Sequence, residues 1–151
     1  GLIVVNTNPL YSERELKHQL NDSGAKALIV LANVAEAAAA VVPETPVETV
    51  IVTEIADLHT GFKRPLINVV VKRVKKMVPD FSFENQISYR KALSLGKSGK
   101  YTPSSPGAED VALLQYTGGT TGVSKGAMIS HRNLMANVLQ SKELFESYGL
   151  N

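Results

Sequence analysis

The chain has 151 residues, of which 44% are hydrophobic and 20% charged, a composition that suits one globular domain and excludes a disordered chain. Sixteen Lys and Arg against 14 Asp and Glu leave a net charge of +2, which is too balanced to indicate a nucleic acid partner. The absence of Cys excludes disulfides, catalytic thiolates and thiolate metal sites. No apolar run predicts a membrane span. Because the sequence begins with Gly on a strand-like run, we expect an internal piece of a longer protein.

The first third of the chain alternates β-branched runs with helical patterns. Ser12 and Glu15 have the spacing of a capping box, which predicts a helix that ends at Gly24. A second helix is expected over 34–42. Apolar runs predict buried strands at 2–5, 27–31 and 47–53. This alternation predicts an α/β fold with a mostly parallel sheet and helical crossovers.

Residues 58–79 form a basic segment that contains six Lys or Arg and no acid. Over 66–78, apolar residues recur at helical spacing, and the bases on the opposite face are Lys72, Arg73, Lys75 and Lys76. The apolar face would comprise Ile67, Val70, Val71, Val74, Met77 and Val78. Such a helix is typical of proteins that bind an anionic membrane surface. A docked helix with solvated charges fits equally well, and the three valines at 69–71 favour a strand.

The last third is expected to start with a short helix over 88–95 and a surface loop over 97–106. Apolar runs then predict strands at 111–116 and 127–129, joined by a glycine-rich loop as in a hairpin. Ser130 can cap a helix over 131–148. The inner face of that helix would carry Leu134, Val138 and Phe145.

The loop between these strands, residues 117–126, has the composition of an anion-binding loop, and we call it the phosphate loop. Its glycines let backbone amides approach an anion, its threonines add hydroxyl donors, and Lys125 adds a positive charge. The order of Lys125 and its neighbours differs from the Walker A pattern, and no Gly-x-Gly-x-x-Gly occurs. His131 opens the next helix and is a candidate for a role beside the loop.

Tyr116 to Gly126 resembles the phosphate-binding signature of the adenylate-forming superfamily, which includes acyl-CoA synthetases, luciferases and nonribosomal peptide adenylation domains. Gly118 stands where Ser is usual, and Ser124 stands where Pro is usual. The continuation to Leu134, together with residues 1–11 and 15–26, is similar to bacterial long-chain fatty acid–CoA ligases. The resemblance implies that 1–151 is part of the N-terminal, ATP-binding domain of such a ligase, without its C-terminal domain.

The resemblance also implies the chemistry of the parent enzyme. Fatty acid and ATP would give an acyl-adenylate and pyrophosphate, and CoA would then displace AMP. ATP and Mg²⁺ are the implied cofactors, with CoA as a co-substrate whose site lies mostly outside this chain. Thr117 would approach Mg²⁺, and no catalytic residue is assigned within the chain, so we expect the isolated piece to be inactive. The implied phosphate-binding residues are Tyr116, Thr117, Gly118, Gly119, Thr120, Thr121, Gly122, Val123, Ser124, Lys125, Gly126 and Ala127.

Two alternatives remain open at this point. The parent could adenylate a different carboxylic acid, because the loop does not select the acid. The chain could also be a noncatalytic membrane-surface module in which the basic segment matters. The fatty acid–CoA ligase hypothesis places the protein in the cytoplasm, peripheral to the inner membrane, and an unpaired sheet edge would favour a homodimer.

Overall fold

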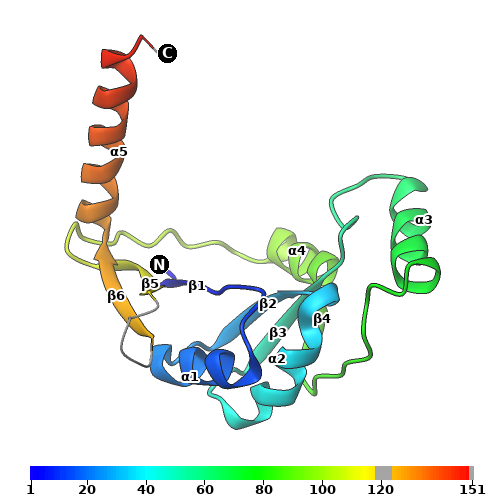
Figure 1. Ribbon diagram of the computed structural model, residues 1–151. Helices are drawn as coiled ribbons and strands as arrows, with labels where there is room; N and C mark the ends of the chain where they lie inside the picture. The colour runs from blue at the N-terminus through cyan, green and yellow to red at the C-terminus, as the bar shows by residue number, and fades with distance from the viewer. Residues whose placement is uncertain (118–123, 150–151) are drawn as a thin grey trace. The chain divides into compact units, whose positions relative to one another are not determined.

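The computed structural model describes residues 1–117 and 124–149, which divide into two compact units (Figure 1). One unit, the central unit, comprises Thr7–Tyr101. The other, the hairpin unit, joins Gly1–Asn6 to the segment that begins at Thr102. Each unit has its own three-stranded sheet.

The sheet of the central unit is wholly parallel, as the sequence predicts. It has the order β2 (Ala27–Leu31), β3 (Thr49–Thr53), β4 (Gln86–Ser88). Ile29 is opposite Ile51, and Ile51 is opposite Ile87. The expected strands at 27–31 and 47–53 are therefore confirmed, whereas β4 was not predicted because three residues are too few for a periodic signal.

Helices α1 (Glu13–Ser23) and α2 (Ala35–Val41) pack on this sheet, and α2 lies between the 3₁₀ turns η1 (Ala32–Val34) and η2 (Val42–Glu44). The capping box of α1 is confirmed, since Ser12 N–H donates to Glu15 at 2.9 Å. Gly24 ends the helix with a φ of +63°, a conformation that suits glycine. The buried core joins both helices to the sheet through Leu16, Leu20, Leu28, Val30, Ala35, Ala38, Val41, Val50 and Phe83.

The basic segment is helical, but its boundaries and its faces differ from the prediction. The helix α3 (Lys63–Val69) begins earlier than expected and continues as the π-helical turn η3 (Val70–Val74). Val74 and Met77, two of the six residues assigned to the apolar face, are exposed. The other four residues of the predicted apolar face, Ile67, Val70, Val71 and Val78, are half-buried. Asn68 on the same side of the helix adds polar contacts, since its Nδ2 donates to Glu54 at 2.6 Å and its Oδ1 accepts from Ala56 N–H. The next helix, α4 (Tyr89–Ser98), continues beyond the predicted 88–95.

The hairpin unit contains the sheet β1 (Val4–Asn6), β5 (Val111–Thr117), β6 (Lys125–Ser130). The hairpin of β5 and β6 is confirmed, and β1 runs parallel to β5 with Val4 opposite Leu113. The expectation that the first strand is buried is wrong, since Leu2, Ile3 and Val4 are exposed. Its only strand partner among the described residues is β5, so it does not extend the sheet of β2 and β3.

Helix α5 (His131–Ser147) follows β6 and extends away from the strands of its own unit (Figure 1). Its capping box joins Ser130 and Asn133. The predicted inner face is wrong for Val138 and Phe145, which are exposed, while Leu134 is half-buried. Helical periodicity identified an apolar stripe, but no described segment covers it beyond the first turn.

Candidate functional site

The phosphate loop begins and ends on paired strands. Thr117, the last residue of β5, is opposite Lys125, the first residue of β6. Predicted phosphate-binding residues 118–123 lie outside the described part of the chain. The structure brings together the two ends of the loop and therefore fixes where it starts and returns.

Both residues at this strand end present polar groups to solvent. Thr117 and Lys125 are exposed, and Lys125 makes no ion pair within residues 1–117 and 124–149. A hydroxyl and an ammonium group on adjacent strands are suited to bind phosphate oxygens from the same side. Of the other predicted residues, Ser124 is half-buried and Ala127 is exposed.

Gly126 has a packing role that the sequence did not reveal. It is opposite Tyr116 across the hairpin, and the Tyr116 ring is buried. A Cβ at position 126 would lie 3.0 Å from the ring atoms Cε2 and Cζ. The glycine therefore allows the aromatic ring to lie over β6, whatever the residue contributes to anion binding.

His131 lies at the far end of β6 from the phosphate loop. The six residues of β6 separate it from the loop by roughly 20 Å at about 3.3 Å per residue. The expectation that His131 lies beside the loop is therefore wrong. Its backbone N–H donates to Asp110 O at 3.1 Å, and Arg132 N–H donates to Ala108 O at 2.8 Å, so this residue helps to fix the start of α5.

Thr117 is the one described residue that the resemblance places near Mg²⁺. Oxygen ligands suit Mg²⁺, and the ion commonly bridges a few protein oxygens and substrate phosphates. No group of three or more His, Asp or Glu able to hold a metal occurs among the described residues. Thr117 fits the role of one ligand, and the remaining ligands would come from ATP or from elsewhere in the protein.

The basic segment presents both charge and apolar surface. Lys72, Arg73, Lys75 and Lys76 are all exposed, as the membrane-surface hypothesis requires. An apolar row that the sequence analysis did not single out accompanies them: Phe62 is 77% exposed, Leu66 59% and Val69 51%. Because α3 docks through the side that carries Ile67 and Asn68, these apolar side chains remain in solvent. No helix within residues 1–117 and 124–149 combines the length and the apolar character that crossing a membrane requires.

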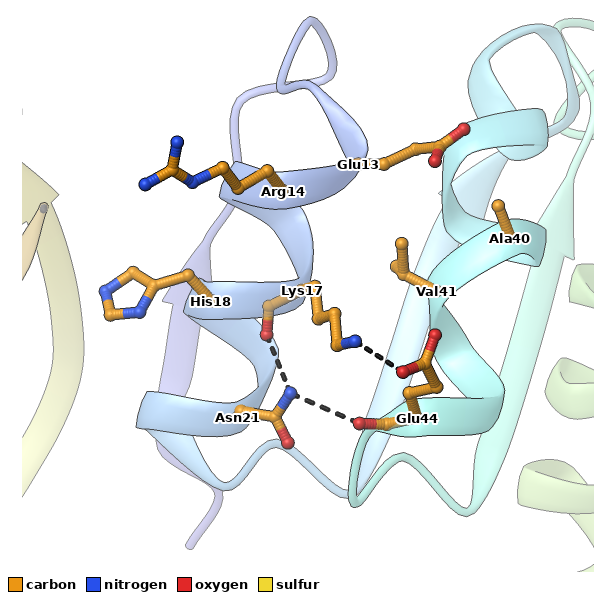
Figure 2. A pocket seen from close by; sticks show the side chains of 8 residues that line it. All are labelled: Glu13, Arg14, Lys17, His18, Asn21, Ala40, Val41 and Glu44. Atoms are coloured by element: carbon orange, nitrogen blue, oxygen red, sulfur yellow. Dashed lines mark hydrogen bonds and ion pairs between the residues drawn. The ribbon is translucent and has the colours of Figure 1, made fainter.

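Two hollows in the central unit carry charged residues. The α1–α2 groove, of about 550 Å³, is an open hollow lined by residues of both helices (Figure 2). Within it Lys17 pairs with Glu44, and Asn21 Nδ2 donates to the carbonyl oxygens of Lys17 and Glu44 at 3.0 and 3.2 Å. Figure 2 shows Arg14 and His18 pointing to the side away from Lys17. The two charged groups at the centre of the α1–α2 groove, Lys17 and Glu44, are thus paired with each other.

The second hollow, which we call the carboxyl-edge cavity, measures about 370 Å³ and was missed by the sequence analysis. Its lining comes from the last residues of β3 and β4, from segments that follow β2, β3 and β4, from α3 and η3, and from the segment before β4. The signal that would have found it is topological, because residues after parallel strands meet at one edge of a sheet.

Comparison with known proteins gives one consistent result. A family model described as AMP-binding enzyme matches residues 1–150. The long-chain-fatty-acid–CoA ligase of Salmonella typhimurium is 50% identical over 145 residues, which are 96% of this chain and 26% of that protein. The ligase of Haemophilus influenzae is 49% identical over 148 residues, or 98% of this chain and 26% of that protein. The chain thus spans about a quarter of the length of these relatives.

Solved structures agree with the sequence relatives. A crystal structure of a long-chain-fatty-acid-CoA ligase from Archaeoglobus fulgidus has a TM-score of 0.54 at 34% identity, and covers 97% of this chain and 23% of that one. The adenylation domain of a carboxylic acid reductase from Segniliparus rugosus has a TM-score of 0.62 at 18% identity, covers 89% of this chain and 21% of that one, and shows the fold alone. These findings confirm the resemblance and the α/β fold class.

Proposed function

The chain belongs to the AMP-binding enzyme family, and from that premise we propose that it forms the ATP-binding segment of a long-chain fatty acid–CoA ligase. The observation that carries the proposal is the identity of about 50% with bacterial ligases over nearly the whole chain. The hairpin that carries the phosphate loop supports it, because a glycine- and threonine-rich loop between paired strands is suited to bind a triphosphate.

In the proposed reaction, a fatty acid carboxylate attacks the α-phosphate of ATP and pyrophosphate leaves. The CoA thiol then attacks the acyl carbonyl, and AMP leaves. The phosphate loop, with its flanking residues Tyr116 and Ala127, contributes positioning and charge neutralisation at the β- and γ-phosphates. Lys125 supplies a full positive charge there, and the glycines supply amides that a side chain would otherwise keep at a distance.

Mg²⁺ would neutralise phosphate charge in this reaction, with the Thr117 hydroxyl as one oxygen near the ion. The chain's own part is to hold that hydroxyl at the end of β5, directly across from Lys125. Because loop residue Gly118 has no side chain, it provides only backbone groups for this purpose. The remaining ligands, the CoA site and the fatty acid site are expected elsewhere in the complete protein.

Pyrophosphate release by the protein expressed from its complete reading frame tests the proposal. The assay supplies ATP, Mg²⁺ and carboxylic acids from short to long chain. Lys125→Ala should lower release by about a hundredfold, the usual cost of removing one preorganised charge-stabilising group. Lys142→Ala is the matched control, since this lysine lies on α5 in the same unit and pairs with Glu146 at 3.5 Å.

Each outcome of this assay separates the hypotheses. Release that requires long-chain acids and falls in Lys125→Ala supports the ligase and the role of the loop. Release with short-chain, aryl or amino acids instead would keep the chemistry and correct the substrate. No release with any acid would favour the noncatalytic alternative. The 151-residue chain by itself is expected to be inactive in the same assay.

We also propose that the basic segment attaches the protein to an anionic membrane surface, which would make it peripheral to the inner membrane on the cytoplasmic side. Support comes from the exposed apolar row Phe62, Leu66 and Val69 and from the absence of acids in 58–79. Apolar side chains would enter the headgroup region while lysines bind lipid phosphates, each adding about 1 kcal/mol.

Vesicle sedimentation tests the attachment with phosphatidylglycerol and with phosphatidylcholine. Replacing Lys72, Arg73, Lys75 and Lys76 by Gln should abolish binding to the anionic vesicles. A control replaces three other lysines by Gln, removing three charges against four, and should retain binding: Lys91, Lys97 and Lys100, on and just after α4. Equal binding of both variants would refute the assignment of the surface.

A homodimer is proposed on one feature of the hairpin unit. Within the described residues, β1 and β6 each pair only with β5 and so form the two edges of their sheet. Unpaired strand edges are templates for pairing with a second copy. Light scattering of the complete protein at several concentrations gives the mass directly, and a monomer mass throughout would reject the dimer.

A further inference from the structure

The carboxyl-edge cavity lies where ligands bind in many open α/β sheets. Ala32 follows β2, Glu54 follows β3, and Ser88 ends β4, and all three line the cavity. Because the three strands are parallel, these residues come to the same edge of the sheet. Loops at this edge form the crevice that holds ligands in doubly wound folds.

Three cationic side chains line this cavity: Arg64 and Lys72 from α3 and η3, and Arg90 from α4. Arg64 Nε is buried and has no hydrogen-bond partner, with its ion-pair partner Asp57 Oδ1 at 4.0 Å. Lys72 and Arg90 make no ion pair with any described residue. These side chains thus retain donors that an anion can use.

The two acids in the cavity are already engaged within the protein. The Asp57 side chain is buried and accepts hydrogen bonds from Glu54 N–H at 2.8 Å and from Thr53 Oγ1 at 3.4 Å. Glu54 Oε2 accepts from Asn68 Nδ2 at 2.6 Å. Both carboxylates keep their negative charge, so the three cations exceed the two acids of the lining by one positive charge.

Local structure brings the cations to the cavity, where Arg90 Nη1 donates to Asp57 O at 3.5 Å and Lys72 is exposed. Arg64 and Asn68 are four residues apart on α3 and share its docked side, while Lys72 on η3 reaches the cavity from an exposed position. Ser88 caps α4, since its hydroxyl accepts from Lys91 N–H at 3.3 Å, and this ten-residue helix therefore begins at the cavity. The positive end of its dipole adds to the field of the three cations.

We propose that the carboxyl-edge cavity is a binding site for a phosphate-bearing anion. Arg90 binds the phosphate through its guanidinium fork, Lys72 supplies a second positive charge, and Arg64 completes the site against Asp57. The cavity of about 370 Å³ accommodates a phosphate and a small polar group attached to it. Two sources provide this chemistry, a phospholipid headgroup and a soluble phosphate ester. The site belongs to the central unit and is independent of the ligase proposal.

Isothermal titration calorimetry of the complete protein tests the site with two probes. Inorganic phosphate represents the soluble source, and monomeric dihexanoyl phosphatidylglycerol represents the headgroup. Because the phosphate loop also binds phosphate in our proposal, each titration uses Lys125→Ala as the parent protein. Saturable binding of either probe is expected, and the probe that binds more tightly identifies the source.

Substitutions in the cavity decide whether it holds the probe. Arg90→Gln and Lys72→Gln should each weaken binding roughly tenfold or more, while Arg90→Lys should retain part of it. Lys17→Gln in the α1–α2 groove is the matched control and should bind as the parent does, since Lys17 is paired with Glu44. If Arg90→Gln does not fold, Lys72→Gln and Arg90→Lys carry the test. Absence of binding by both probes, or equal binding by all variants, would overturn the proposal.

Discussion

The two units of the chain use their apolar residues in different ways. In the central unit, α1, α2 and the parallel sheet enclose a continuous core that includes Leu20, which is 2% exposed. In the hairpin unit, buried hydrophobic residues are confined to Ala112 and Tyr116 within the described segments, while Leu144 on α5 is 56% exposed. An apolar stripe therefore does not guarantee a core, because burial requires a partner surface at the right distance along the chain.

The central unit and the hairpin unit therefore have different tasks. The central unit contains the packing that most of a domain's stability depends on. The hairpin unit contains the phosphate loop and, with its exposed apolar residues, offers surface that other parts of a protein could cover. Relatives about four times as long have those other parts, since this chain spans 26% of them.

Two Leu→Ala substitutions, one in each unit, should show the largest difference in stability between the units. Leu20→Ala should lower the free energy of unfolding of the 151-residue chain by about 2–5 kcal/mol, because it leaves a cavity in a closed core. Leu144→Ala should change it by less than about 0.5 kcal/mol, because that side chain is already in solvent. Urea denaturation followed by circular dichroism measures both variants.

A similar loss of unfolding free energy in both variants would contradict the difference between the two units. It would mean that α5 packs its apolar stripe against protein in solution. The same two substitutions can be measured in the complete protein. A larger loss of unfolding free energy for Leu144→Ala there would show that another segment covers α5.

Local signals in the sequence predicted the elements well and their partners poorly. The Ser12–Glu15 box and the run at 27–31 depend on neighbouring residues, and the structure confirms both. The partner of the first strand is β5, and the Asn6 and Gln115 side chains that meet between these strands are 109 residues apart. No local pattern specifies such a pairing, because its free energy depends on the whole sheet.

The two candidate sites differ in the same way, since one is formed by contiguous residues and the other by residues far apart in the sequence. The phosphate loop could be predicted because its glycines, threonines and lysine are contiguous in the sequence. The carboxyl-edge cavity could not, since its cations come from positions 64, 72 and 90 and converge only after three parallel strands align. The contribution of Asn68 to the docking of α3 was also missed, because it binds the loop after β3 through hydrogen bonds that a hydrophobic pattern does not reveal.

Alanine substitutions at two glycines give a smaller effect with opposite signs in the two units. Gly126→Ala should destabilise the chain by about 1–3 kcal/mol, because its Cβ would lie 3.0 Å from the buried Tyr116 ring. Gly96→Ala should stabilise it by about 0.5–1 kcal/mol, since this position is within α4 and nothing lies within 4 Å of the new Cβ. Thermal and urea unfolding of both variants provide the measurement.

A stable Gly126→Ala variant would show that the Tyr116 ring can move aside, and the hairpin would then be less tightly packed than its register indicates. In that case the glycine would be explained by anion binding alone. Pyrophosphate release by the same variant in the complete protein separates the two roles, because a loss of release without a loss of stability points to the phosphate loop.

The smallest expected difference is in how the two capping boxes respond to pH. Both have the same hydrogen-bond arrangement, but the third helical residue is Glu15 in α1 and Asn133 in α5. In α1 the Ser12 hydroxyl and backbone N–H donate to the Glu15 carboxylate at 2.6 and 2.9 Å, which lowers the pKa of Glu15 from 4.5. The contribution of this cap is therefore complete above pH 4.5 and is lost as the pH falls through the lowered pKa. In α5 the corresponding residue is Asn133, whose amide accepts from Ser130 N–H at 3.0 Å and does not titrate.

Amide hydrogen exchange at Ser12 and Ser130, corrected for intrinsic rates, measures this difference as the pH is lowered from 6 to 3. Protection at Ser12 should fall below pH 4.5, while protection at Ser130 should not change with pH while its unit stays folded, because Asn133 does not titrate. Glu15→Gln is the matched control, because it keeps an acceptor and removes the titration, so the pH dependence at Ser12 should disappear. A parallel fall at both serines would mean that the helices open together, and the two units would then not be independent in stability.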